Sequence, residues 1–104
     1  PEAGAGAGLR AFKDSPISAF TEQDMAYFEA ARTEALEKRA DGENITWKNP
    51  ETGNSGTITP IRTYERGGAR CRLLRIVNNS RSQSGESRFN FCEQAGGGWK
   101  VVSP

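Results

Sequence analysis

The stretch that decides the fold is A-R-C-R-L-L-R-I-V, residues 69–77, together with S-R-F-N-F-C-E, residues 87–93. Both segments have the aliphatic and aromatic content of β-strands, and the polar residues between them contain turn formers. Each segment carries one of the two cysteines, Cys71 and Cys92. If the segments pair as an antiparallel hairpin with these cysteines opposite each other, the partner of every other residue follows.

This register predicts which side chains share a face of the hairpin. The face expected to meet the core carries Leu74, Ile76, Phe89 and Phe91. The other face carries Cys71, Leu73, Arg75, Val77, Arg88, Asn90 and Cys92. On it Arg75 is directly opposite Arg88, an unfavourable pair of like charges unless an anion or a carboxylate lies between them. The two arginines are therefore a candidate anion-binding site.

One amphipathic helix is predicted from about residue 22 to residue 40. Thr21 is a favourable N-cap with Asp24 at the third helical position, an aspartate variant of the capping box, and Phe20 and Met25 are placed for a hydrophobic staple. Apolar residues then recur at steps of three and four, at Met25, Phe28, Ala31, Ala35 and Leu36. We expect this apolar face to pack on a sheet.

Three further short strands are predicted at residues 45–47, 57–64 and 99–102. Pro60 removes a backbone donor, so its strand lies at an edge of the sheet or carries a bulge there. A helix followed by five strands predicts an α+β fold, in which one N-terminal amphipathic helix packs on a five-stranded antiparallel meander sheet. We expect Trp47 and Trp99, from the first and last strands, to cover the ends of the sheet core.

The beginning of the chain differs in composition from the rest. Residues 3–8 read A-G-A-G-A-G, which is typical of a flexible linker, although Gly4 and Gly8 have the spacing of a small-residue membrane-helix face. We therefore expect residues 1–20 to be a flexible linker or the end of a glycine-rich segment, and residues 21–104 to form one domain. A first residue other than methionine indicates a processed or trimmed product, from which a signal peptide would have been lost.

Charge is divided unevenly along the sequence. Residues 1–52 hold six Lys/Arg and ten Asp/Glu, and residues 53–104 hold eight and three, so the halves carry net charges of −4 and +5. The arginines of the second half are Arg62, Arg66, Arg70, Arg72, Arg75, Arg81 and Arg88. They either form a patch for anionic glycan or lipid headgroups, or solvate the sheet and pair with the acidic helix. Without a nucleic-acid-binding motif, we expect no nucleic-acid partner.

The residue types argue against most catalytic and metal sites. The chain has no histidine, which excludes Ser-His and Cys-His nucleophile pairs and the commonest transition-metal ligand. Two isolated cysteines lack the additional ligands of a zinc site. We therefore predict that the protein is not an enzyme and has no catalytic residues, metal or cofactor. Cysteine number alone does not decide between a disulfide and two buried thiols.

A turn-rich segment, N-P-E-T-G-N-S-G, occupies residues 49–56. The polar side chains of Asn49, Thr52, Asn54 and Ser55 need hydrogen-bond partners. The segment is either a structural turn, in which these partners lie within the protein, or an exposed recognition loop, in which a ligand supplies them.

Several of these motifs occur together in one known family. W-K-N-P-E-T-G-N-S-G at residues 47–56, T-I-T-P at 57–60, Cys71-Arg72, Cys92 and G-W-K-V-V at 98–102 resemble the C-terminal domain of the bacterial 17 kDa surface antigen family. The resemblance covers residues 47–102. The family often has Cys-Arg and Asp-Gly where this chain has Cys92-Glu93 and Gly97-Gly98, so the chain is similar to a divergent member.

The resemblance implies a compartment and a class of function. Proteins of this family are outer-membrane lipoproteins of Gram-negative bacteria, with a lipid-attachment cysteine and a glycine zipper before this domain. It therefore implies an exported protein of the periplasm or outer membrane, where oxidising conditions favour a disulfide between Cys71 and Cys92. Its membrane contact would be an N-terminal anchor missing from the sequence, and its partner an unidentified protein or envelope component.

Two classes of function remain at this point. The resemblance implies a non-enzymatic structural or binding domain of the cell envelope, a surface antigen. The alternative is a soluble periplasmic ligand-binding or inhibitor module with a pocket between the helix and the sheet.

Overall fold

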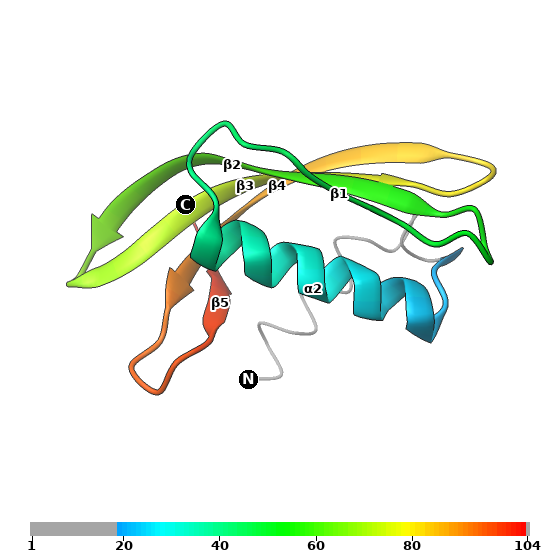
Figure 1. Ribbon diagram of the computed structural model, residues 1–104. Helices are drawn as coiled ribbons and strands as arrows, with labels where there is room; N and C mark the ends of the chain where they lie inside the picture. The colour runs from blue at the N-terminus through cyan, green and yellow to red at the C-terminus, as the bar shows by residue number, and fades with distance from the viewer. Residues whose placement is uncertain (1–18, 104) are drawn as a thin grey trace.

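A computed structural model of the protein describes residues 19–103, so the linker expected over residues 1–20 lies almost entirely outside the described residues. The described elements are α2 (Glu22–Lys38), β1 (Ile45–Lys48), β2 (Ser55–Arg66), β3 (Ala69–Asn79), β4 (Ser84–Glu93) and β5 (Trp99–Val102). All strand pairs are antiparallel in the order β1-β2-β3-β4-β5, and the sheet arches over α2 (Figure 1). The predicted α+β meander is confirmed.

Helix α2 begins as predicted and ends earlier than predicted. The Thr21 hydroxyl accepts a hydrogen bond from the Asp24 backbone N–H at 3.1 Å, and the Asp24 carboxylate accepts one from the Thr21 N–H at 2.8 Å, which completes the capping box. The helix ends at Lys38 because Arg39 adopts an extended backbone conformation. In the last turn the carbonyl groups of Ala35 and Leu36 accept hydrogen bonds from Arg72 of the sheet.

The register of the central hairpin is the predicted one. Cys71 faces Cys92 and Arg75 faces Arg88. Both strands extend further into the polar stretch between them than expected, and they join through a turn in which the Ser80 N–H donates to the Gln83 carbonyl at 2.8 Å. Polar side chains do not interrupt the ladder because its hydrogen bonds are made by the backbone.

Strand β2 resolves the two possibilities raised by Pro60. The register between β2 and β3 shifts between Pro60 and Arg62, so the strand carries the predicted bulge, and it lies between β1 and β3 instead of at an edge. Gly67 and Gly68 both have positive φ angles, 58° and 83°, which a two-residue hairpin turn into β3 requires.

The core lies between α2 and the sheet. Its buried members are Phe28, Ala31, Ala35, Leu36, Ile45, Trp47, Ile58, Leu74, Ile76 and Phe91, with Phe20, Met25, Phe89 and Trp99 packed against them. At the centre Leu36, Ile58 and Leu74 are each no more than 2% exposed. Buried apolar side chains therefore occupy the centre of the interface between α2 and the sheet.

Candidate functional site

A buried carboxylate joins the start of α2 to the loop between β1 and β2. Asp24 is fully buried, and its Oδ1 accepts hydrogen bonds from Asn49 Nδ2 at 2.8 Å and Thr52 Oγ1 at 2.7 Å. Its Oδ2 accepts from Asn54 Nδ2 at 2.8 Å and from the Thr21 N–H. These five residues are called the Asp24 cluster below. Four donors surround one negative charge, which is how a buried carboxylate remains ionised.

The loop residues hold one another in position for this role. The Asn49 N–H donates to the Asn54 carbonyl at 2.9 Å, and the Gly53 N–H donates to the Asn49 carbonyl at 2.8 Å. The Asn49 side-chain oxygen accepts from the Glu51 N–H at 3.0 Å, an Asx turn, and Thr52 Oγ1 accepts from the Asn54 N–H at 3.2 Å. The backbone of the loop therefore directs its three side-chain donors inward.

Hydrogen bonding determines the charge state of Asp24. Burial on its own would raise the pKa of this carboxyl, but the hydrogen bonds from Thr21, Thr52, Asn54 and Asn49 outweigh it and lower the pKa from about 3.8 to about 2. Asp24 is thus a negative charge at every physiological pH.

These contacts decide between the two readings of the loop. Asn49 is fully buried and Asn54 is 5% exposed, so the expected exposure of a recognition loop is wrong for both residues, because their amides are used by Asp24. Thr52 and Ser55 are half-buried, and Ser55 is already part of β2. The geometry is that of a structural turn.

The tryptophan and the last glycine of the same motif pack against each other. Trp47 lies on β1, 5% exposed, with Phe20 against its edge and Tyr27 stacked on it at a centroid distance of 6.2 Å. A Cβ atom at Gly56 would lie 2.5 Å from Trp47 Nε1 and 2.9 Å from the Val77 carbonyl oxygen. Only glycine leaves room for the indole at this point of the sheet.

We expect Gly56→Ala to lower the free energy of unfolding by about 2 kcal/mol, because the added methyl group displaces the indole or the backbone of β3. Gly96→Ala is the matched control, since a Cβ there meets nothing within 4 Å. Urea unfolding followed by tryptophan fluorescence measures both variants. Equal midpoints for Gly56→Ala and the wild-type protein would contradict the close packing.

The second tryptophan lies at the opposite edge of the sheet. Trp99, on β5, is half-buried against the core, and the Arg70 guanidinium lies over its ring, 5.1 Å from the centroid. The two tryptophans therefore occupy the two edge strands on the helix side.

A buried arginine joins the other end of α2 to the sheet. Arg72, 5% exposed, donates from Nη1 to the carbonyl oxygens of Ala35 and Leu36 at 2.8 and 3.1 Å. Its Nη2 donates to Asp41 Oδ1 at 2.9 Å, and its Nε donates to Thr63 Oγ1 at 2.9 Å. The hydrogen bond from Arg72 lowers the pKa of Asp41. A positive charge thus satisfies the carbonyl end of the helix and complements its dipole.

Sequence reasoning missed both buried charges. Asp24 was interpreted only as a capping residue, and no local pattern relates it to donors some 25 to 30 positions away. For Arg72 a signal existed, because the hairpin register pairs it with Phe91 on the core face. A charged residue at such a position predicts a buried ionic partner.

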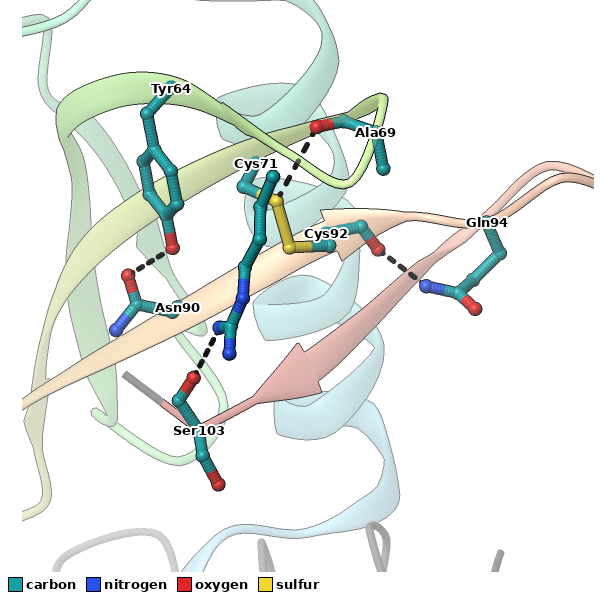
Figure 2. The surroundings of a disulfide bond; sticks show 8 residues. Tyr64, Ala69, Cys71, Asn90, Cys92, Gln94 and Ser103 are labelled. Atoms are coloured by element: carbon teal, nitrogen blue, oxygen red, sulfur yellow. Dashed lines mark hydrogen bonds between the residues drawn. A yellow bond between two sulfur atoms is a disulfide. The ribbon is translucent and has the colours of Figure 1, made fainter.

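The disulfide lies on the sheet face that points away from α2. Cys71 and Cys92 are bonded, with Cα atoms 4.0 Å apart, and both are buried. Around them the Tyr64 hydroxyl donates to Asn90 Oδ1 at 2.6 Å and Gln94 Nε2 donates to the Cys92 carbonyl at 2.9 Å (Figure 2). The bridge joins β3 and β4, the two strands of the predicted hairpin.

Opening this bridge is expected to lower the free energy of unfolding by about 3 kcal/mol, because a closed loop of this length restricts the unfolded chain. Urea unfolding with and without reductant measures the difference. The double variant Cys71→Ala, Cys92→Ala is the control and should unfold at the same urea concentration in both conditions. Identical midpoints for the oxidised and reduced wild-type protein would contradict this contribution.

The opposed arginines have a carboxylate between them. Arg75 Nε lies 3.0 Å from Glu86 Oε2, and Arg88 Nε lies 3.8 Å from the same oxygen. The hydrogen bond from Arg75 lowers the pKa of Glu86. The protein thus provides its own anion here, so the pair does not require a bound anion to relieve the repulsion.

Within residues 19–103, no group of three or more His, Cys, Asp or Glu side chains is placed to hold a metal ion. Within the same residues, α2 is neither long nor apolar enough to cross a membrane.

Comparison with known proteins extends the region of similarity into the helix. Residues 34–100 match a family model described as the 17 kDa outer membrane surface antigen. The 17 kDa surface antigen of Rickettsia prowazekii (strain Madrid E) is 36% identical over 85 residues, covering 79% of this chain and 52% of that protein. The antigen of the same name from Rickettsia bellii (strain RML369-C) is 36% identical over 104 residues, covering 96% and 64%. The chain spans about half to two thirds of these relatives, and no solved structure matches it.

Proposed function

The chain belongs to the 17 kDa outer membrane surface antigen family, and from this premise we propose that it is a non-enzymatic structural or binding domain of the bacterial cell envelope. In the complete protein it is exported and held at the outer membrane by a lipidated N-terminal segment. Its partner is another protein or component of the envelope.

One observation carries this proposal: the residues of the motif that led to the family are used inside the domain. Asn49, Thr52 and Asn54 bind the Asp24 carboxylate, and Gly56 makes room for Trp47. A motif whose residues hold a loop to a helix has a structural role, which suits a family whose members share a fold and not a catalytic site. An enzyme motif would present such groups to a substrate.

The disulfide supports the compartment. Structural disulfides persist in oxidising compartments such as the periplasm and the cell surface, whereas cytosolic thiols are kept reduced. Cys71 and Cys92 join two interior strands, β3 and β4, and a small domain gains stability from such a covalent link.

The test uses the complete gene product in a Gram-negative host. Growing cells are quenched with acid, denatured in the presence of an alkylating reagent, and the mass of the protein is measured, while parallel cultures are fractionated and treated with protease from outside. We expect Cys71 and Cys92 to escape alkylation and the protein to be found in the envelope fraction. Two alkylated thiols on a protein of the cytosolic fraction would overturn the proposal.

A further inference from the structure

The face of the sheet opposite α2, called the outer face below, collects positive charge. Strand register places alternate residues on it, and the bulge after Pro60 puts Arg62 and Tyr64 opposite Leu73 and Cys71 on this side. Its cations are Lys48, Arg62, Arg66, Arg75, Arg88 and Lys100. The one carboxylate that the register places among them is Glu86.

Positive and negative charge are therefore distributed unequally between the outer face and the rest of the domain. The described residues contain 12 Lys/Arg and 11 Asp/Glu, a net charge of +1. Six cations and one carboxylate on the outer face give it +5, so the six remaining cations and ten remaining carboxylates give the rest of the described domain −4. A nearly neutral domain thus presents one strongly basic surface.

The structure changes the membership of the arginine patch that the sequence left as one of two possibilities. Arg72 is buried beneath α2, Arg70 donates to the Leu36 carbonyl at 3.1 Å, and Arg81 donates to the Thr52 carbonyl at 3.0 Å. These three arginines are therefore not part of the patch, because they donate hydrogen bonds to the helix and to the β1–β2 loop. Lys48 and Lys100 join it from the two edge strands.

The contacts of the outer-face cations leave most of their charge uncompensated. Arg75 and Arg88 share the single carboxylate of Glu86, and their side chains are 43% and 59% exposed. Arg62 lies over the Tyr64 ring, 4.7 Å from its centroid, and Arg66 donates to the backbone carbonyl of Ser103. Neither a ring nor a carbonyl neutralises a guanidinium.

We propose that the outer face docks on an anionic phospholipid surface, an inference that rests on the envelope location proposed above. The cations are spread over all five strands, and half-buried Leu73 and Val77 lie among them, as suits adsorption at a headgroup layer. A site for single-stranded nucleic acid would offer free aromatic rings for stacking. The aromatic residue of this face, Tyr64, is already covered by Arg62 and donates its hydroxyl hydrogen to Asn90.

Co-sedimentation with vesicles tests the proposal on the domain itself. The vesicles are phosphatidylcholine alone, or equal parts of phosphatidylcholine and phosphatidylglycerol, at about 20 mM and about 500 mM salt. The outer-face variant is Lys48→Glu with Lys100→Glu. The control, Arg32→Glu with Lys38→Glu, changes the net charge equally on the helix side. Circular dichroism verifies that both variants fold.

We expect the wild-type domain to bind the anionic vesicles at low salt and to leave them at high salt. The outer-face variant should lose at least about tenfold in partition coefficient while the control variant keeps its binding. Equal losses in both variants, binding to phosphatidylcholine alone, or no vesicle binding at low salt would overturn the proposal. Binding to soluble heparin without binding to vesicles would also overturn the proposal. None of these outcomes bears on the compartment found in cells.

Discussion

Asp24→Asn is expected to lower the free energy of unfolding by about 3 to 5 kcal/mol. The carboxylate accepts four hydrogen bonds, whereas an asparagine side chain has one acceptor oxygen and turns an NH2 group toward other donors. The amides of Asn49 and Asn54 are buried, so at least one donor would be left without a partner or water. The β1–β2 loop and the start of α2 should therefore lose their contact with each other.

Chemical unfolding followed by circular dichroism measures this loss. Glu29→Gln is the matched control, because it removes the same charge and the same atom from an exposed position of α2 and should shift stability by less than about 0.5 kcal/mol. Similar midpoints for the two variants would mean that the Asp24 cluster does not hold the helix to the loop.

The same residue predicts a dependence of stability on pH. Because folding depresses the pKa of Asp24 from about 3.8 to about 2, its contribution is complete above pH 3.8 and disappears as the pH falls toward 2. The loss amounts to about 2 kcal/mol. Asp24→Asn should remove this part of the acid destabilisation, and Glu29→Gln should retain it.

Arg72→Met is expected to lower the free energy of unfolding by about 3 kcal/mol. Methionine can fill the space of the aliphatic stem, but it offers no hydrogen for the carbonyl groups of Ala35 and Leu36 or for Asp41. The two carbonyl groups lie in the last turn of α2, so this turn should fray first.

Two measurements distinguish the hydrogen bonds of Arg72 to the end of α2 from a contribution of its side chain to core packing. Amide hydrogen exchange should quicken in the last turn of α2 while the strands remain protected. Arg88→Met removes the same group from a side chain that is 59% exposed, and it should change stability little. Unchanged exchange in the last turn of the Arg72 variant would refute the proposed cap.

Some elements were predictable because they depend on neighbours in the sequence. The capping box of α2 involves residues three positions apart, and the alternation of β3 and β4 predicts the core face once one cross-strand pair is assumed. The pattern of residue types predicts an end of β3 that is too early and a start of β4 that is too late, because polar residues are typical of turns, although backbone pairing continues through them.

Some features of the candidate site were likewise predictable from the sequence, and others were not. Turn chemistry was visible in the segment from Asn49 to Gly56, but which side chains point inward was not, because the answer depends on Asp24 in a different element. The repulsion between Arg75 and Arg88 followed from register. Its relief by Glu86 required the position of a flexible side chain.

Patterns of residue type and spacing along the chain were sufficient to predict the class of fold and the family resemblance, and to predict the register of the cysteine hairpin once Cys71 was assumed to face Cys92. The folded molecule was needed to see that Asp24 and Arg72 attach the two ends of α2 to the sheet, and that positive charge gathers on the outer face. These contacts join residues that lie far apart along the chain. A buried charge is satisfied by whichever donors or acceptors the fold brings within about 3 Å, and those partners leave no local pattern.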